Sequence, residues 1–404
     1  MSGAKTKLVP KLRFPEFRSA GGWTLRELGD CLDYLQPTQY LVNSTAYNDN
    51  YEIPVVTAGK TFILGHTDET EGVFDQPLPV VIFDDFTTAT QYVDFRFKAK
   101  SSAMKILLAK QNANIKFIYE SIQQIDYEVG AHGRHWISVY SKIKVAIPKL
   151  DEQQKIADCL SSLDELIAAL ARKVNALKTH KKGLMQQLFP REGETQPRLR
   201  FPEFQETADW ATEPLGEAFD TTSGGTPSRS NSEYWNGDIP WVTTTQVDFG
   251  VITAAEEFIS QSGLKNSSAK VFPKGTVLIA MYGQGKTRGQ VAMLGIDAAT
   301  NQACAAVLPS KKVDPRFVFF NFSARYEDLR GLSNSGGQEN LSQGLIRDLP
   351  FSYPEAMAEQ QRIADCLASV DTHITAASQA LDSLKTHKQG LMQQLFPSPE
   401  AVAA

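Results

Sequence analysis

Residues 152–190 read EQQKIADCLSSLDELIAALARKVNALKTHKKGLMQQLFP, and residues 359–397 read EQQRIADCLASVDTHITAASQALDSLKTHKQGLMQQLFP. Of these 39 positions, 25 are identical. A shorter tag, KLRFPEF at residues 11–17 and RLRFPEF at residues 198–204, opens each half of the chain. Between the tag and the long block the two halves share little. The sequence therefore predicts one repeated frame that carries two different globular domains.

Each long block has apolar residues at alternating steps of four and three, which places them on one seam of a helix that needs a partner. The residues expected to pair the helices are Ile156, Leu160, Leu163, Ile167, Leu170, Val174 and Leu177 in the first block, and Ile363, Leu367, Val370, Ile374, Leu381 and Leu384 in the second. The simplest partner of each helix is the other copy. We therefore predict an antiparallel coiled coil with internal pseudo-twofold symmetry, with a pair of ordinary core helices as the alternative.

Single residues mark the ends of these helices. Lys181 and Lys388 interrupt the seam at equivalent positions, and we expect them near the C-terminal ends, where a cation suits the helix dipole. Asp151 is the expected cap of the first helix, and Pro190 and Pro397 are expected to stop both helices.

The segments outside the helices read as β-rich with short helices, because residues 80–83, 143–147 and 277–280 are compact apolar runs typical of strands. The predicted fold class is α+β: two β-rich α/β domains separated by the two long helices. The expected boundaries are residues 1–150 for the first domain, 151–190 for the first helix, 191–197 for a linker, 198–355 for the second domain, 356–397 for the second helix and 398–404 for a tail.

Bulk composition limits the function classes. The chain of 404 residues has no apolar run long enough to span a membrane and no apolar signal core, so we expect a cytoplasmic protein. None of its four cysteines forms a CxxC pair, so a zinc site is not expected. The net charge is −5, whereas a protein that binds DNA by a broad basic surface is normally cationic. A nucleic-acid role would therefore need locally concentrated basic residues or a partner that shares the contacts.

Two motifs resemble cofactor sites. Residues 280–287, AMYGQGKT, lack the first glycine of a phosphate-binding loop and are better explained as a glycine-rich loop that brings Lys286 and Arg288 to a polyanion. Residues 348–351, DLPF, differ from the DPPF of amino-methyltransferases, and no cofactor loop precedes them, so we expect a loop that leads into the helix. No catalytic or metal-binding set can be assembled from the sequence.

Polar residues suited to DNA contacts gather in the dissimilar parts. Arg and Lys pair with guanine and phosphates, and Asn and Gln with adenine. The candidates in the first half are Lys60, Thr87, Thr88, Lys98, Lys105, His132, Arg134 and His135. The candidates in the second half are Thr226, Ser228, Arg229, Gln284, Lys286, Arg288, Gln290, Asn301, Gln302, Gln338 and Asn340. The alternative for each group is a solvated loop or turn.

Further strings add to the duplicated tag and helix starts. They are VTAGK at residues 56–60, VVIFDDFTT at 80–88, RHWISVY at 134–140, SGGTPSR at 223–229 with YWNGDIPWV at 234–242, GIDAATNQA at 295–303 and GGQENLSQGLIRDLPF at 336–351. In this order, and over nearly the whole chain, they resemble the specificity subunit of a type I restriction–modification system.

The resemblance implies two target recognition domains, each of which reads one half of a bipartite, asymmetric site in double-stranded DNA. The helices would set the spacer and dock two methyltransferase subunits, and a motor–nuclease subunit can join the complex. This chain would be non-catalytic and hold no cofactor. S-adenosylmethionine would belong to the methyltransferase subunits, which methylate adenine N6, and ATP and magnesium to the motor subunit.

Two alternatives remain open beside the DNA-recognition subunit of the prokaryotic cytoplasm that the resemblance implies. One is a self-contained methyltransferase or nuclease. The other is a coiled-coil protein-interaction scaffold without direct base readout.

Overall fold

The structure, a computed structural model, describes residues 8–128, 134–191, 193–283, 286–332 and 341–397. The chain divides into two compact units. Unit 1 consists of Met1–Ala171 and Gln379–Ala404, and unit 2 consists of Arg172–Ser378. Each unit holds one globular domain and part of both long helices, because α4 (Leu150–Leu188) and α10 (Met357–Leu395) continue across the division.

Within each unit the two long helices run antiparallel, as predicted. In unit 1, Leu160 near the start of α4 shares a core cluster with Leu395 at the end of α10. In unit 2, Leu188 at the end of α4 shares a cluster with Ile363 near the start of α10. The buried and half-buried seam positions of α4 and α10 are Ile156, Leu160, Leu163, Ile167, Leu170, Val174, Leu177, Ile363, Leu367, Val370, Ile374, Leu381 and Leu384.

The helix-dipole explanation for the two seam lysines is wrong. Lys181 Nζ lies 2.6 Å from Asp371 Oδ1, and Lys388 Nζ lies 2.7 Å from Asp164 Oδ1. Each lysine therefore bonds a carboxylate of the other long helix, and Lys181 is too far from Leu188, the last residue of α4, to feel the helix end strongly. The pairs favour antiparallel pairing, because a parallel pairing in register would bring the two equivalent lysines together.

Around Lys388 the pair grows into a four-charge cluster. Lys388 Nζ also bonds Glu120 Oε1 at 3.1 Å, and Lys116 Nζ bonds Asp164 Oδ2 at 2.7 Å and lies 2.8 Å from Glu120 Oε1. Burial alone would raise the pKa of Asp164, but the hydrogen bonds from Lys116 and Lys388 outweigh it, and the pKa is lowered. In unit 2 the place of Glu120 is taken by Phe320, whose ring lies 5.3 Å from Lys181 Nζ.

The duplicated tag and the duplicated helix start meet in a buried socket in each unit. In unit 1, Arg13 donates two hydrogen bonds of 2.6 Å to the carboxylate of Glu152, which also accepts from Trp23 Nε1 at 3.2 Å. The same contacts in unit 2 join Arg200, Glu359 and Trp210. These contacts explain both repeats, because the duplicated tag supplies the arginine and the duplicated helix start supplies the glutamate.

The glutamine after each of these glutamates is a second repeated contact. Gln153 Oε1 accepts from the backbone N–H of Asn114 at 2.9 Å, and Gln360 Oε1 accepts from that of Asp314 at 2.8 Å. Asn114 and Asp314 are the N-caps of α2 (Ile115–Ile122) and α7 (Pro315–Ala324). Each long helix therefore fixes the start of a short helix in the domain.

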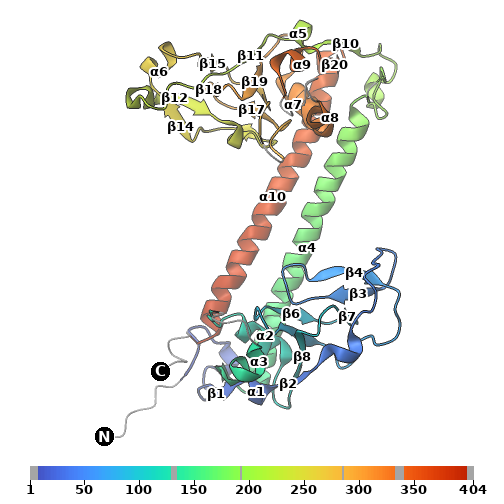
Figure 1. The fold of residues 1–404 in the computed structure, drawn as a ribbon, viewed down its shortest axis with the longest axis vertical. Coiled ribbons are helices and arrows are strands. Elements are labelled where there is room, and N and C mark those ends of the chain that lie inside the picture. Colours follow the sequence, from blue (N-terminus) through green and yellow to red (C-terminus); the bar gives the residue numbers. More distant parts are fainter. Residues whose placement is uncertain (1–7, 129–133, 192, 284–285, 333–340, 398–404) are drawn as a thin grey trace. The chain divides into compact units, whose positions relative to one another are not determined.

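The domain of unit 1 combines three sheets with short helices (Figure 1). The main sheet has the order β2 (Leu32–Leu35), β8 (Met104–Ala109), β5 (Val80–Asp84) and β6 (Thr90–Val93). A smaller sheet has the order β4 (Ile63–Thr67), β3 (Ile53–Val56) and β7 (Lys98–Ala99), in which β3 and β7 run parallel. The third pairs β1 (Thr24–Glu27) with β9 (Lys144–Ile147). The short helices are α1 (Leu28–Cys31), α2 and α3 (His135–Ser138).

The domain of unit 2 repeats this plan with additions. Its main sheet has the order β11 (Thr221–Ser223), β19 (Cys304–Val307), β16 (Val277–Ala280), β17 (Val291–Leu294) and β13 (Val251–Ile252). The second sheet has the order β14 (Glu257–Ile259), β12 (Trp235–Val242), β18 (Ala298–Thr300) and β15 (Val271–Phe272), with β12 and β18 parallel. The third pairs β10 (Ala211–Pro214) with β20 (Pro350–Tyr353). The other helices are α5 (Leu215–Ala218), α6 (Gln261–Lys265), α8 (Tyr326–Gly331) and α9 (Gln343–Arg347).

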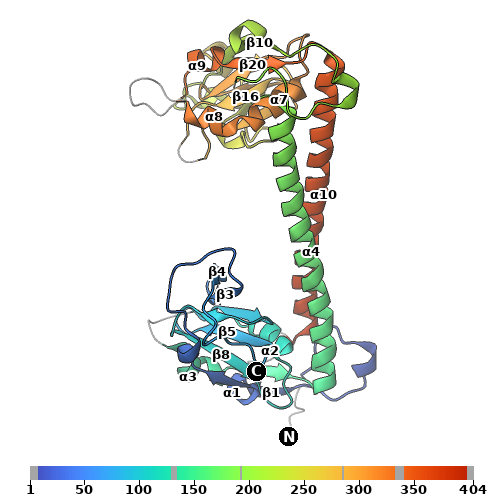
Figure 2. The same cartoon turned by 90° about the vertical axis from the view of Figure 1, so that its right-hand side faces the viewer.

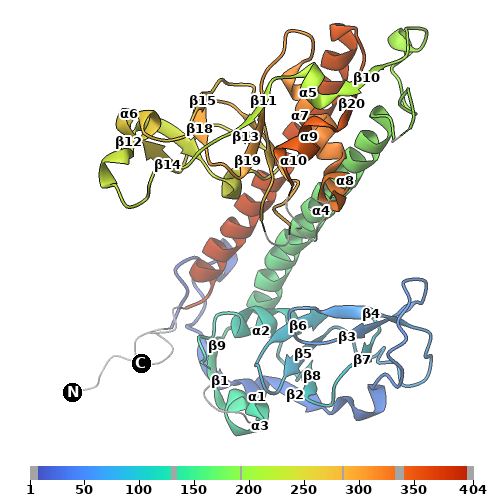
Figure 3. The ribbon, with the colours of Figure 1, turned by 45° about the horizontal axis from the view of Figure 1, so that its top comes forward.

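In unit 2 the sheets differ in how far they lie from the long helices. Figure 2 shows α7 and the β10–β20 pair beside the first turns of α10. Figure 3 shows β12, β14, β18 and α6 on the side of the domain away from α10. The second sheet has a core cluster of its own, which includes Trp241 and Ile259, whereas a larger cluster joins Phe317 and Phe351 to residues of the long helices.

Of the local predictions, the three strands are confirmed and two others are wrong. The three predicted strands are present as β5, β9 and β16. Asp151 is not a cap, because α4 already begins at Leu150. Residues 348–351 do not form a loop into the helix: α9 ends before them, and residues 350 and 351 open β20.

Candidate nucleic-acid interface

In unit 1 the turn after β5 and the segment that begins α3 meet at Asp85. The backbone carbonyl of Asp85 accepts from His135 N at 2.9 Å, and its carboxylate accepts from Trp136 N at 2.9 Å. Arg134, the residue before α3, is exposed. Asp85 therefore places Arg134 beside the turn that carries Thr87 and Thr88.

The turn itself is held by the preceding aspartate. Asp84 Oδ1 accepts from the N–H groups of Phe86 and Thr87 at 2.9 and 2.8 Å, and the Asp84 carbonyl accepts from Thr88 N at 2.9 Å. Thr88 has a φ of 58°, which few β-branched residues adopt. The side chain of Thr87 is exposed, whereas that of Thr88 is half-buried.

Two lysines predicted as DNA contacts are structural instead. Lys105 is fully buried, and its ammonium lies 3.0 Å from Asp85 Oδ2 and donates to Gln36 Oε1 at 3.1 Å. Lys98 is 2% exposed and pairs with Glu69 at 2.9 Å. Neither ammonium can reach a phosphate without giving up its buried partner, so both predictions are corrected.

His135 is also corrected, because it is buried and its Nδ1 lies 3.2 Å from the hydroxyl of Tyr127. Lys60 is exposed on the loop between β3 and β4, where Thr57 Oγ1 donates to the carbonyl of Thr61 at 2.8 Å. Gln91 of β6 donates to the carbonyl of Gly59 at 3.5 Å. This loop therefore lies beside β6, the strand that follows the Thr87–Thr88 turn.

In unit 2 a glycine pair brings the loop before β12 against the turn after β18. Gly225 N donates to the carbonyl of Thr300 at 2.8 Å, and a Cβ on Gly224 would collide with that carbonyl. Thr226 Oγ1 donates to Oε1 of Gln302. Asn301 is half-buried, and its Oδ1 has no hydrogen-bond partner among the described residues. The structure thus brings the predicted residue Thr226 together with the predicted pair Asn301 and Gln302.

Arg229 is exposed but held in place. Its guanidinium lies 3.7 Å from the ring centre of Trp235. It also forms a hydrogen-bonded ion pair with Glu257, and this hydrogen bond lowers the pKa of Glu257. Ser228, next to it, is exposed and shares a hydrogen bond with Ser230. The stacking leaves Arg229 more than half exposed as a preoriented cation.

Three further predicted residues of unit 2, Lys286, Arg288 and Gln290, belong to the hairpin between β16 and β17. Lys286 is exposed, and its carbonyl accepts from the hydroxyl of Tyr326 at 2.5 Å. Arg288 donates to the carbonyl of Arg330 at 2.9 Å, and Gln290 Nε2 donates to Asp248 at 2.8 Å. The hairpin is thereby tied to α8 and to the loop before β13.

The two units place these segments equivalently. Asp85 N donates to Ala103 O at 3.0 Å and Met281 N donates to Ala303 O at 2.8 Å, each directly after an inner strand of the main sheet. The carbonyl of Asp85 accepts from His135 N, and that of Met281 accepts from Leu341 N at 3.0 Å. His135 in unit 1 thus corresponds to Leu341 in unit 2. His132, Gln284, Gln338 and Asn340 lie outside the described residues.

The sequence prediction missed the residues that hold these contacts. Asp84, Asp85, Trp235 and Glu257 organise the turns but were not singled out. A signal existed for the aspartates, because an acidic pair directly after an apolar run is typical of a side-chain-capped turn. Trp235 and Glu257 lie 22 positions apart in the sequence, and no local pattern connects them.

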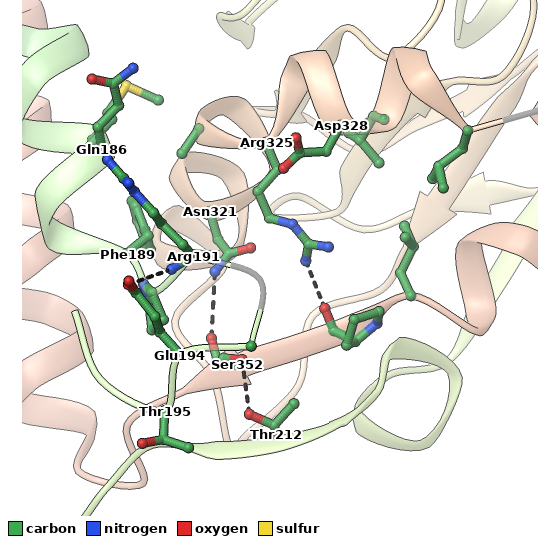
Figure 4. A pocket seen from close by; sticks show the side chains of 18 residues that line it. Gln186, Phe189, Arg191, Glu194, Thr195, Thr212, Asn321, Arg325, Asp328 and Ser352 are labelled. Carbon is green, nitrogen blue, oxygen red and sulfur yellow. Dashed lines mark hydrogen bonds between the residues drawn. The ribbon is translucent and has the colours of Figure 1, made fainter. Parts of the chain in front are cut away.

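A pocket of about 730 Å³ lies elsewhere in unit 2, where α4 ends (Figure 4). Asn321 lines it, is 3% exposed and donates to the carbonyl of Ser352 at 3.4 Å. Arg325 donates to the carbonyl of Pro350 at 2.6 Å. The pocket includes none of the predicted DNA contacts, so we do not assign it to the interface.

Within the described part of the chain, no group of three His, Cys, Asp or Glu side chains is placed to hold a metal ion. Among the described helices, none is both long and apolar enough to cross a membrane.

Comparison with known proteins agrees with this architecture. The family model described as the type I restriction modification DNA specificity domain matches residues 20–179 and 207–386. The EcoR124I/EcoR124II specificity subunit of Escherichia coli is 33% identical in an alignment 401 positions long that covers 93% of this chain and 95% of that protein.

Two solved structures share the fold. The specificity subunit of a type I restriction–modification system from M. genitalium has a TM-score of 0.64 at 17% identity and covers 96% of this chain and 99% of its own. A chain from a study of complex assembly and conformational transition of the type I system has a TM-score of 0.53 at 17% identity, over 96% and 98%. With both halves matched by the family model and one relative aligned along almost its whole length, the chain belongs to the family of type I restriction–modification DNA specificity subunits.

Proposed function

We propose that this DNA-recognition subunit reads a bipartite, asymmetric site, with the domain of unit 1 on one half-site and that of unit 2 on the other. The observation that carries the proposal is the equivalent placement of unlike side chains. In unit 1 the turn between β5 and β6 carries Thr87 and bonds the residues that follow Arg134, whereas the equivalent connection in unit 2, between β16 and β17, is longer and carries Lys286. Different donors and acceptors on one scaffold would read different base edges.

The long helices would hold the two domains at a fixed separation and thereby set the length of the spacer. Half-sites on one face of DNA are separated by about 34–36 Å per helical turn. The repeated sockets support this role, because buried Arg–Glu contacts join each domain rigidly to its helix.

The chain would act in the prokaryotic cytoplasm with two methyltransferase subunits that methylate adenine N6 from S-adenosylmethionine. A motor–nuclease subunit that uses ATP and magnesium would join them. The net charge of −5 supports shared DNA binding, since the partners would supply part of the phosphate contacts.

The test is to map methylated adenines in DNA from cells that carry this chain with its methyltransferase subunits. Arg134→Ala is expected to relax or lose only the half-site of unit 1, and Arg229→Ala only that of unit 2. Lys142→Ala and Lys265→Ala, exposed lysines of the same units, serve as controls. If both arginine variants methylate the original site as well as the controls do, direct readout by these residues is wrong, and the scaffold alternative gains support.

A further inference from the structure

An exposed aromatic ring occupies the same place in both units. Phe86 follows Asp85, and Tyr282 follows Met281, the two residues that the backbone contacts with Ala103 and Ala303 make equivalent. The residue before each ring is buried, at 1% for Asp85, whereas Phe86 is 45% and Tyr282 is 40% exposed.

Single exposed apolar residues are common on protein surfaces and need no explanation. Here the two halves differ in sequence around the position, and yet each keeps a large ring there. Neither ring belongs to a hydrophobic core cluster of the described residues, or packs against one as a partly buried neighbour. Recurrence at one place outside the core indicates a shared contact outside the chain.

Hydrogen bonds hold the turn of Phe86 and the base of the hairpin that carries Tyr282. Phe86 N is bonded to Asp84 Oδ1, as described above. In unit 2 the base of the hairpin closes through Ala280 N to Gln290 O and Gly289 N to Ala280 O, both at 2.9 Å. A ring on a fixed turn loses little conformational freedom when it binds.

Cationic and hydroxylic side chains lie near both rings, and in unit 1 the half-buried Asp84 adds a carboxylate that holds the turn. Thr87 and Arg134 flank the turn of Phe86, and Lys286 lies on the hairpin of Tyr282. A flat apolar group beside side chains that can bind phosphate is suited to contact a nucleic-acid base. Such a group can contact the methyl group of thymine or insert at a base step that has been opened.

We infer that Phe86 and Tyr282 are equivalent base-contacting residues, one for each half-site, that insert an aromatic ring against the bases of duplex DNA. This inference rests on the proposed function and adds specific residues and an apolar mode of contact to it. Tyr282 can also bond a base or phosphate through its hydroxyl group.

The experiment uses the full chain in complex with its methyltransferase subunits and a synthetic duplex that carries the mapped site. Phe86→Ala and Tyr282→Ala are each expected to weaken binding of that duplex by about 5- to 150-fold, the range for loss of one base–aromatic contact. Phe86→Tyr and Tyr282→Phe should keep most of the affinity. Leu25→Ala and Phe258→Ala, which truncate equally exposed apolar residues elsewhere in the two units, are the controls.

A second readout separates contact from folding. The thermal unfolding midpoint of each alanine variant should match that of its control, and duplexes with changes in one half-site should show that each ring affects only its own half. If the wild-type complex has no sequence preference, the proposed function itself fails. If it has one, and Phe86→Ala and Tyr282→Ala bind like the controls, only this inference is overturned.

Discussion

Replacing Glu359 by alanine should destabilise unit 2 more than any surface change. Glu359 is 1% exposed and accepts two bonds from Arg200, at 2.8 and 2.9 Å, and one from Trp210 at 3.2 Å. The substitution removes all three and leaves a buried guanidinium without its carboxylate. Arg200 keeps hydrogen bonds to the carbonyls of Thr207 and Ala208, which soften the loss.

Breaking a buried ion pair by removing one partner costs about 3–5 kcal/mol. Because Arg200 retains other acceptors, we expect the lower end, about 3 kcal/mol. For a unit of roughly 200 residues, this lowers the unfolding midpoint by about 6–12 °C. The control is Glu203→Gln, which breaks the ion pair between Glu203 and Arg362. Both of these side chains are about half exposed. That change should cost less than about 1 kcal/mol.

Calorimetry and urea denaturation of the purified chain would measure both variants. Glu152→Ala is the matched change in unit 1, where Glu152 bonds Arg13 and Trp23 in the same way. It should destabilise unit 1 by a similar amount. If Glu359→Ala lowers stability no more than Glu203→Gln does, the buried contacts of Glu359 do not stabilise unit 2.

Three further outcomes are expected. Lys181→Asp or Asp371→Lys alone should lower the unfolding midpoint, and the double change should restore most of the loss. The expected coupling energy in a double-mutant cycle is about 1–2 kcal/mol, between the values for exposed and buried pairs. Additive losses would contradict the pairing. The pKa of Asp164 is lowered in the folded state, so its stabilisation is complete above its ordinary pKa and lost as the pH falls through the folded value. The stability gap between wild type and Asp164→Asn in urea should therefore narrow from pH 7 to pH 3, and a constant gap would exclude this origin. Lys105→Met should cost about 3–5 kcal/mol by stranding the carboxylate of Asp85, and a second change of Asp85 to Asn should recover part of it; no recovery in urea denaturation would mean that the cost lies elsewhere.

The long helices and their antiparallel pairing could be predicted because their signal is periodic and local. Every seam residue lies where the 4-3 spacing places it. The partners of Lys181 and Lys388 could not be predicted, since Asp371 and Asp164 are about two hundred positions away and the register of the pairing decides which residues meet.

The candidate interface was predicted only in part for a similar reason. Basic residues in a variable segment suggest DNA contacts, but Lys105 lies between Met104 and Ile106 in a strand whose two faces are both covered. A charged residue within an apolar strand is more often a buried ion-pair partner, and its carboxylate, Asp85, comes from the neighbouring strand end. Arg229 and Arg134 do remain accessible, and their supporting contacts come from residues that no local pattern links to them.

The difference between Glu120 and Phe320 limits how freely the two domains could be transplanted. Either domain could form the Arg–Glu–Trp contacts at either position, because both halves supply the same three side chains. A graft of the second domain at the first position would nevertheless present a phenyl ring to Lys388, which now binds Glu120 as well as Asp164. Chimaeras should therefore assemble best when the residue facing the lysine travels together with its own stretch of long helix.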